Sequence, residues 1–306
     1  MNGGFTYVSR IGGSVAGLSL LDHLAARYRH STRDEWRERI DAGLVLVEGR
    51  PARAGDLLRR GATIAWARPP WEEPEAPLTY ALLYEDAALL AVAKPAGLPT
   101  LPGGGYLDHT LLALVRRRHA AATPVHRLGR GTSGIVLFAR TARASRALAR
   151  AWRERRVTKV YRALVEGRPE RNSFTVETGI GRVPHPVLGT VFAACPGGLP
   201  SRSVVRVLER GQATSLVEAR IETGRPHQIR IHMAASGHPL AGDPLYAAGG
   251  GLREDGRALP GETGYLLHAL RVALDHPETG APFEVVCRPP CALEISVERD
   301  ATAPFI

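Results

Sequence analysis

Four arginines recur along one predicted helix, and their spacing suggests that this helix binds phosphate groups. Arg143, Arg146, Arg150 and Arg153 follow Thr141, a residue type that often caps a helix N-terminus. Their spacing of i, i+3, i+7 and i+10 places all four on one face of the helix, where like charges repel each other. Such a stripe is usually only a solvated face, but the mutual repulsion favours a surface that binds a polyanion.

A second predicted helix, residues 226–236, carries two histidines whose spacing excludes a shared metal ion. His227 and His232 are five residues apart, so on a helix their side chains point about 140° apart. Histidine pairs that bind zinc on a helix are four residues apart. The three cysteines of the chain lack CxxC spacing, so we expect neither a zinc site nor a disulfide framework.

The charge balance of the whole chain points to nucleic acid as the partner. The 306 residues carry a formal net charge of +10, and a basic excess favours polyanions. Only Lys94 and Lys159 are lysines among the 40 basic residues. GC-rich coding explains that ratio, but it does not explain the excess of basic over acidic residues. No apolar run reaches the ~20 residues of a membrane span and no secretory signal is evident, so we expect a cytoplasmic protein without a membrane partner.

The elements that position these residues fall into two predicted domains. Residues 66–79 contain four prolines and three glutamates, a composition typical of a stiff, solvated linker. We therefore place the first domain at residues 1–68, the linker at residues 69–79 and the second domain at residues 80–306.

The first domain is predicted to be a small α+β unit. Ser19 and Thr32 each begin a predicted helix and have an acidic residue three positions on, which is the pattern of a capping box. Gly43 can end the second helix in the left-handed conformation. Two short strands, residues 44–47 and 63–66, follow the helices.

The second domain is predicted to be α+β with a mixed, mainly antiparallel sheet flanked by helices. Residues 88–93 and 135–139 are near-continuous apolar runs, typical of strands buried on both faces. Two antiparallel strand pairs are predicted within residues 204–221 and 266–287. The Gly-rich, polar residues 247–264 are expected to form a surface loop.

Four segments of the second domain resemble, in the same order, the motifs of the RluA-like RNA pseudouridine synthases. Residues 85–98 read EDAALLAVAKPAGL, and residues 125–140 read VHRLGRGTSGIVLFAR. Residues 159–167 read KVYRALVEG, and residues 223–233 read TGRPHQIRIHM. Any one of them could arise by chance, but four in order identify the resemblance.

The resemblance implies an isomerase that converts uridine to pseudouridine in RNA, with the pseudouridine synthase fold and with no cofactor or metal. The reaction cleaves the N1–C1′ bond and rejoins the base through C5, so the nucleotide must be flipped out of its stack. Residues 43–49, GLVLVEG, are similar to a pattern of the S4 RNA-binding domain. Both features suggest that the partner is structured RNA, and ribosomal RNA rather than transfer RNA. We expect the protein to be a monomer.

The resemblance also implies roles for individual residues. Tyr161 corresponds to the family's active-site tyrosine, although an ordinary core tyrosine is the alternative. Arg230 corresponds to the arginine that pairs with the catalytic aspartate, and Arg127 to a residue that enters the RNA where the base leaves. Further RNA contacts are expected from Lys94, His126, Arg130 and the helix arginines Arg143, Arg146, Arg150 and Arg153.

The family's catalytic aspartate is replaced by Gly129, which has no side chain to attack C1′ or to accept a proton. Residues 109–152 contain no Asp or Glu, so a replacement acid would have to come from Asp108, Glu222 or Asp243. Without the aspartate, a buried Arg230 needs another acid or a phosphate as its partner. Gly131 also loosens this turn, which argues against a single accidental substitution.

Three interpretations follow from Gly129. The protein is an active synthase that has moved its acid or tolerates the loss, a non-catalytic RNA-binding protein such as a folding or assembly factor, or a point variant of an active enzyme.

Overall fold

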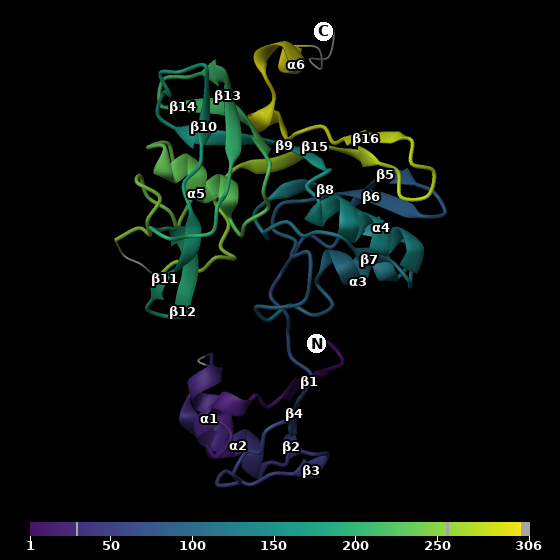
Figure 1. Ribbon diagram of the computed structural model, residues 1–306, viewed down its shortest axis with the longest axis vertical. Coiled ribbons are helices and arrows are strands. Elements are labelled where there is room, and N and C mark those ends of the chain that lie inside the picture. The colour runs from purple at the N-terminus through teal and green to yellow at the C-terminus, as the bar shows by residue number, and fades with distance from the viewer. Residues whose placement is uncertain (29, 255–256, 301–306) are drawn as a thin grey trace. The chain divides into compact units, whose positions relative to one another are not determined.

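The computed structural model describes residues 1–28, 30–254 and 257–300 (Figure 1). The chain divides into two compact units, Met1–Glu73 and Pro74–Ile306. This division falls inside residues 69–79, where the sequence suggests a linker. No helix in the described part of the chain is long and apolar enough to cross a membrane.

The N-terminal unit combines two capped helices with a four-stranded sheet in the order β1-β4-β2-β3. The Ser19 side chain accepts a hydrogen bond from the Asp22 amide, and Thr32 forms a full capping box with Glu35, as predicted. Trp36 is among the buried residues of the small core. The elements are β1 (Phe5–Arg10), a 3-10 turn η1 (Gly13–Val15), α1 (Leu20–Arg27), α2 (Arg33–Asp41), β2 (Val45–Val47), β3 (Arg50–Pro51) and β4 (Thr63–Arg68).

The larger unit is built on a ten-stranded sheet whose main path runs β10-β13-β14-β9-β15-β8-β6-β5. All its strand pairs are antiparallel except β8 with β15, which confirms the predicted mixed, mainly antiparallel sheet. The strands are β5 (Ala81–Glu85), β6 (Leu89–Lys94), β7 (Thr123–Pro124), β8 (Ser133–Ala139), β9 (Thr158–Glu166), β10 (Ser173–Val176), β13 (Ser203–Arg210), β14 (Thr214–Ile221), β15 (Leu267–Asp275) and β16 (Pro282–Val286). A separate hairpin pairs β11 (Ile180–His185) with β12 (Gly189–Ala194), and the last elements are η2 (Cys291–Leu293) and α6 (Ser296–Asp300).

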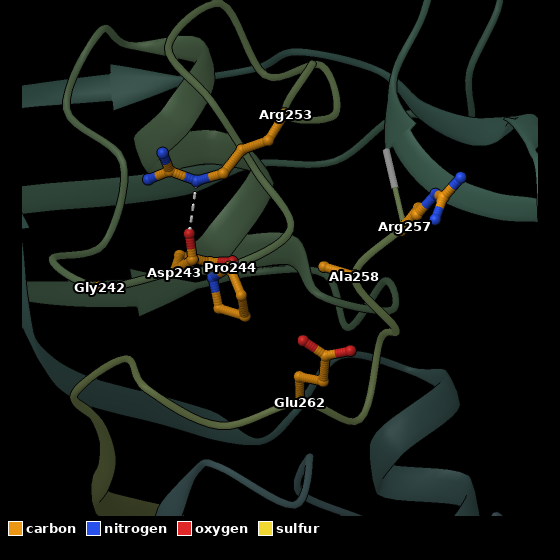
Figure 2. A pocket seen from close by; sticks show the side chains of 7 residues that line it. All are labelled: Gly242, Asp243, Pro244, Arg253, Arg257, Ala258 and Glu262. Carbon is orange, nitrogen blue, oxygen red and sulfur yellow. Dashed lines mark hydrogen bonds between the residues drawn. The ribbon is translucent and has the colours of Figure 1, made fainter. Parts of the chain in front are cut away.

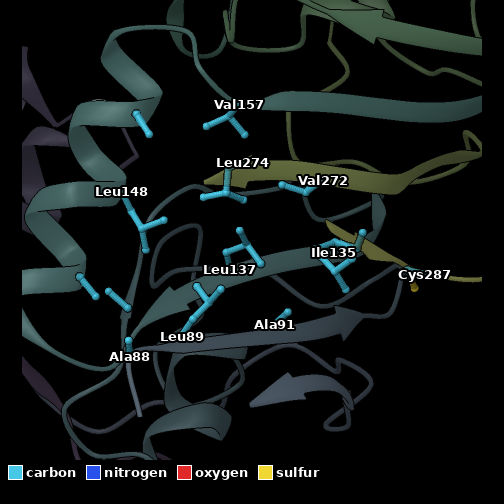
Figure 3. Packing of buried hydrophobic residues seen from close by; sticks show 14 residues of the cluster. Ala88, Leu89, Ala91, Ile135, Leu137, Leu148, Val157, Val272, Leu274 and Cys287 are labelled. Carbon is cyan, nitrogen blue, oxygen red and sulfur yellow. The ribbon is translucent and has the colours of Figure 1, made fainter. Parts of the chain in front are cut away.

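Helices cover both faces of one half of the sheet, which explains the apolar character of its central strands. On one face, α4 (Ala142–Arg153) packs Leu148 against Leu89 and Leu137 (Figure 3). On the other face, α3 (Leu111–Arg116) packs against Val136 and Phe138. Every residue of β8 is buried, so the prediction of strands buried on both faces is confirmed.

The helix α5 (Gln228–Ala235) lies between the other half of the sheet and the β11–β12 hairpin. Ile229 and Met233 pack into a cluster with residues of β9 and β14, whereas Ile231 and Ala234 pack with the hairpin. Seven of its residues are buried, and three of these, Gln228, Arg230 and His232, are polar; a buried charge is costly unless it is paired. The buried setting of Arg230 on this helix therefore requires a partner.

The two halves of the sheet meet where β8 pairs with β15. Gly134 lies opposite Ala269, and its φ is +105°. A Cβ atom on Gly134 would lie 2.3 Å from the Ala269 carbonyl oxygen, so only glycine fits at this close approach. Ala269 also pairs with Tyr161 on β9. The seam therefore brings the loop before β8, the segment before β15 and Tyr161 into one region.

Candidate active site

The turn after β6 holds the loop that carries Gly129. The Lys94 ammonium donates hydrogen bonds to the carbonyls of Pro95 (2.8 Å), Leu98 (2.6 Å) and Arg130 (3.3 Å). Burial lowers the pKa of Lys94 to about 7, and the side chain is 1% exposed. The RNA contact expected from Lys94 is therefore wrong, because its ammonium faces the interior and positions the loop.

Thr100 anchors the same loop through two hydrogen bonds to Leu128. Its hydroxyl donates to the Leu128 carbonyl at 2.9 Å and accepts from the Leu128 amide at 3.2 Å. Leu128 is buried, whereas its neighbours Arg127 and Gly129 are exposed. The loop thus presents these two residues at the surface while a buried anchor lies between them.

Tyr265, at the start of the segment that leads into β15, packs against this loop. A Cβ atom on Gly129 would lie 3.3 Å from the Tyr265 hydroxyl oxygen, and one on Gly131 would lie 2.9 Å from the ring carbon that bears the hydroxyl. Neither glycine has a positive φ, so the backbone does not require glycine at either position. The Tyr265 side chain instead occupies the space that a side chain at either position would need.

Arg230 reaches the same ring from α5 and is fully paired. Its Nε and Nη2 donate to the two carboxylate oxygens of Asp243 at 2.6 and 2.7 Å, and its Nη1 donates to the Pro260 carbonyl at 3.1 Å. The guanidinium carbon lies 4.3 Å from the centre of the Tyr265 ring and 5.0 Å from that of Tyr246. Of the two partners expected for Arg230, another acid or a phosphate, the structure shows an acid, Asp243.

Asp243 cannot also act on a sugar, because its carboxylate is already engaged. The side chain is 0% exposed, and Oδ1 additionally accepts from the amides of Leu245 (2.9 Å) and Tyr246 (3.2 Å). Asp243 therefore combines the turn-capping role expected for it with a buried ion pair, and it is excluded as a nucleophile.

The other two candidate acids gain no support as replacements. Glu222 forms ion pairs with Arg202 and Arg220, so its charge is used at the surface. Asp108 lies exposed before α3 and stays a prediction.

Tyr161 lies where the two halves of the core meet. It packs against the cluster that contains Leu128 and against the cluster that contains Tyr265 and Ile229. Burial raises the pKa of Tyr161 to about 12, so the hydroxyl stays protonated at neutral pH. Among the described residues the hydroxyl has no hydrogen-bond partner, which leaves it available to a ligand.

Arg127 has no ion-pair or hydrogen-bond partner in the part of the chain that the structure describes. It lies close enough to His227 to help lower the pKa of that histidine to about 3, after burial and the charge of Arg230. His227 is the N-cap of α5, with φ 55°, and its Nδ1 lies 2.8 Å from the Tyr246 hydroxyl. The exposed guanidinium of Arg127 therefore stands at the edge of the region that contains Arg230.

His126 and Arg130, both expected to bind RNA, make contacts within the protein. The His126 Nε2 accepts from the Leu137 amide at 3.0 Å, and its ring stacks on Trp152 at 5.1 Å. Burial, with a smaller effect of Lys159, lowers its pKa to about 4. Arg130 donates to the Gly261 carbonyl at 2.7 Å and to the Tyr106 hydroxyl at 3.0 Å. Both residues therefore build the loop and its surroundings, and this geometry does not support direct RNA contacts.

The four arginines of α4 are exposed as the sequence indicates. None of them has an ion pair or hydrogen bond to any described residue. Glu154, the acid nearest to the stripe, pairs instead with Arg156. The positive charge of this face is therefore not neutralised by any residue that the structure describes.

A hollow of about 560 Å³ lies beside Asp243, on the loop that follows α5 (Figure 2). Arg253 donates to the Asp243 carbonyl oxygen at 2.7 Å, and Arg257 and Glu262 also line the hollow. The sequence predicts only a surface loop over residues 247–264 and gives no signal for this arrangement or for Tyr265. No group of three or more His, Cys, Asp or Glu side chains in the described residues could hold a metal ion.

Comparison with known proteins finds proteins named as pseudouridine or pseudouridylate synthases from both sequence and structure. A family model described as RNA pseudouridylate synthase matches residues 88–235. The chain is 40% identical over 262 residues to an uncharacterized RNA pseudouridine synthase of Synechocystis, covering 85% of this chain and 90% of that protein. It is 36% identical over 329 residues to RNA pseudouridine synthase 5 of Arabidopsis thaliana, covering 90% and 89%.

Two further relatives broaden the comparison. Ribosomal large subunit pseudouridine synthase D of Neisseria meningitidis is 36% identical over 278 residues, covering 86% of this chain and 72% of that protein. The solved structure of human RNA pseudouridylate synthase domain containing 1 matches with a TM-score of 0.57 and 28% identity, covering 73% and 89%.

Proposed function

The chain belongs to the RNA pseudouridylate synthase family of isomerases, and on that premise we propose that it converts uridine to pseudouridine in structured RNA. We propose ribosomal RNA rather than transfer RNA, in the cytoplasm and by a monomer. A relative named ribosomal large subunit pseudouridine synthase D supports the first point. The target nucleotide is flipped out of its stack to reach the site.

One observation carries this proposal: the segments that resemble the family motifs converge at one place although they are far apart in sequence. Gly129 and Arg230 both contact Tyr265, and Tyr161 packs against the cluster that contains Tyr265. Exposed Arg127 stands at the edge. In the proposed complex the Tyr161 ring supports the flipped uracil, because aromatic faces stack on bases, and Arg127 takes the place that the base leaves.

The arginine face of α4 supports binding to the RNA backbone. Four unneutralised charges on one side of a helix attract phosphates and release counterions when they bind. The N-terminal unit is proposed as an S4-like RNA-binding domain, and its exposed Arg27 and Arg37 add positive charge there.

A second candidate function is a non-catalytic RNA-binding protein on the same fold. Two observations favour it: Gly129 carries no carboxylate, and the carboxylate nearest to Arg230 is fully used within the protein. Under this hypothesis the protein binds structured RNA as a folding or assembly factor and releases it unchanged.

One experiment separates the two functions. The protein and its Gly129→Asp variant are incubated with total RNA from cells that lack the enzyme, and pseudouridine is quantified by nucleoside chromatography. We expect the native protein to form pseudouridine above the level of a no-enzyme control. Product from the Gly129→Asp variant alone would support the binding protein, and RNA affinity measured in parallel by filter binding would show whether either form fails to hold the RNA.

A further inference from the structure

We propose that the Tyr265 hydroxyl is the nucleophile of this enzyme and stands in for the missing carboxylate. The inference rests on the proposed function, since it assigns a catalytic residue to the proposed isomerisation. It starts from a shape match: a large aromatic side chain lies against two glycines of the loop, and neither glycine is required by its backbone conformation.

The distance from the Tyr265 hydroxyl oxygen to the Cβ position of Gly129 is only slightly longer than the distance from Cβ to the carboxylate oxygens in an aspartate. The oxygens of an aspartate lie roughly 2.4 Å from Cβ, one C–C bond and one C–O bond away. The Tyr265 oxygen lies 3.3 Å from the Cβ position of Gly129. The loop therefore presents a side-chain oxygen near this point, although the oxygen comes from a different segment of the chain.

The surroundings of the hydroxyl suit an oxygen that gains negative charge. The Arg230 guanidinium carbon lies 4.3 Å from the centre of the Tyr265 ring, so a positive charge faces the side chain on which negative charge would develop during the reaction. The Thr132 hydroxyl lies 3.4 Å from the Tyr265 oxygen and can donate to it. Gly129 is exposed and has no side chain, so nothing on that residue separates the hydroxyl from a bound nucleotide.

Two described side-chain oxygens lie within 4 Å of the Cβ position of Gly129, that of Tyr265 at 3.3 Å and that of Thr132 at 3.6 Å, and the Tyr265 oxygen is the nearer. Asp243 is excluded because Arg230 and two backbone amides occupy its carboxylate. Tyr161 is already assigned, in the proposed function, to stacking on the flipped base. A tyrosine is also chemically competent, because tyrosine serves as the nucleophile at the anomeric carbon in sialidases.

The proposed reaction balances without any co-reactant. The Tyr265 oxygen bonds to C1′ as the N1–C1′ bond breaks; the bonding electrons go to N1, and the phenol proton passes to N1. The neutral uracil turns, and C5 attacks C1′ while the bond between C1′ and the tyrosine oxygen breaks. The proton on C5 then passes to the phenolate, which restores Tyr265 and leaves pseudouridine with its N1–H.

The test compares pseudouridine formation by the full-length native protein with that by Tyr265→Phe, Gly129→Asp and the double variant. Phenylalanine keeps the ring that packs on the glycines, so the melting temperature and RNA affinity should be unchanged. We expect Tyr265→Phe to lose about 100-fold or more in rate, and Gly129→Asp in that background to restore activity. Tyr84→Phe, which removes a hydroxyl on β5 that bonds to Asp86, should react like the native protein.

The outcomes separate this inference from the proposed function. If the native protein is active and Tyr265→Phe retains its rate within threefold, Tyr265 is not the nucleophile and the proposed function stands. If the native protein binds RNA but forms no pseudouridine, both proposals fail. A loss of activity together with a lower melting temperature, not restored by Gly129→Asp, would assign Tyr265 a packing role and overturn the inference.

Discussion

Breaking the ion pair between Arg230 and Asp243 should strongly destabilise the larger unit. Both side chains are almost fully inaccessible, at 2% and 0% exposed, so removing one charge leaves the other buried and unpaired. Such a loss costs about 3–5 kcal/mol of the free energy of unfolding. We therefore expect Asp243→Asn, which preserves the shape and leaves an oxygen for the Leu245 and Tyr246 amides, to cost about 3 kcal/mol or more.

Arg230→Met should cost less than Asp243→Asn. The Asp243 carboxylate then still accepts from two backbone amides, whereas the guanidinium that remains in Asp243→Asn loses the acceptor of its Nε and the opposite charge. The double variant carries no unpaired charge, so its loss should be smaller than the sum of the single losses by about 2 kcal/mol.

Urea unfolding at pH 7, followed by circular dichroism for the native protein and the three variants, measures these losses. Glu284→Gln, which removes an exposed partner of Arg271, is the control and should change stability by less than about 1 kcal/mol. A double variant whose loss equals the sum of the single losses within about 0.5 kcal/mol would show that the pair does not form in solution. Arg230 would then be free to bind an external anion.

Three further perturbations test the loop, the RNA-binding face and the buried histidine. Gly131→Ala places a Cβ 2.9 Å from the Tyr265 ring and should lower the free energy of unfolding by about 1–3 kcal/mol; a melting temperature equal to the native value would contradict the packing, and Gly3→Ala, with open space around it, is the control. Replacing all four arginines of α4 with glutamine should reduce the slope of log K against log salt by roughly 0.7–0.9 for each phosphate that the variant no longer binds; filter binding measures it, and an unchanged slope would exclude this face. The pKa of His126 is lowered to about 4, so the unfolded chain takes up its proton first as the pH falls. The free energy of unfolding should therefore decrease between pH 6.5 and 4, by up to about 3 kcal/mol from this residue; His126→Gln should lack this contribution, and equal pH dependence of both proteins would refute the assignment.

Local signals in the sequence predicted the local structure well. The caps at Ser19 and Thr32 depend on residues three positions apart, and both form. The two antiparallel strand pairs form between the segments that the apolar patterns suggest. The strand β1 was missed although its sequence, FTYVSR, is rich in aromatic and β-branched residues; it is short, and its pairing with the distant β4 leaves no local signal.

The site was predicted only in part, because its chemistry depends on residues that the fold brings from afar. The motif residues Tyr161 and Arg230 lie in the same region, next to Tyr265. The sequence around Lys94, in contrast, does not reveal that its ammonium is buried among carbonyl groups. Tyr265 contacts Thr132 across 133 positions of sequence, and no periodic pattern reports such a contact. The need for an acid beside Arg230 follows from burial alone, whereas the choice of Asp243 depends on how the chain turns after α5.

The glycine at the seam between β8 and β15 limits how this enzyme can exchange parts with its relatives. Because any side chain at Gly134 would collide with backbone atoms of Ala269, a donor segment must carry glycine at this position, whatever residue faces it on β15. A chimera that imports residues 125–140 from a relative should therefore fold only when the imported segment keeps this glycine. The constraint on recombination is thus a single position, set by the backbone of a strand that is distant in the gene and adjacent in space.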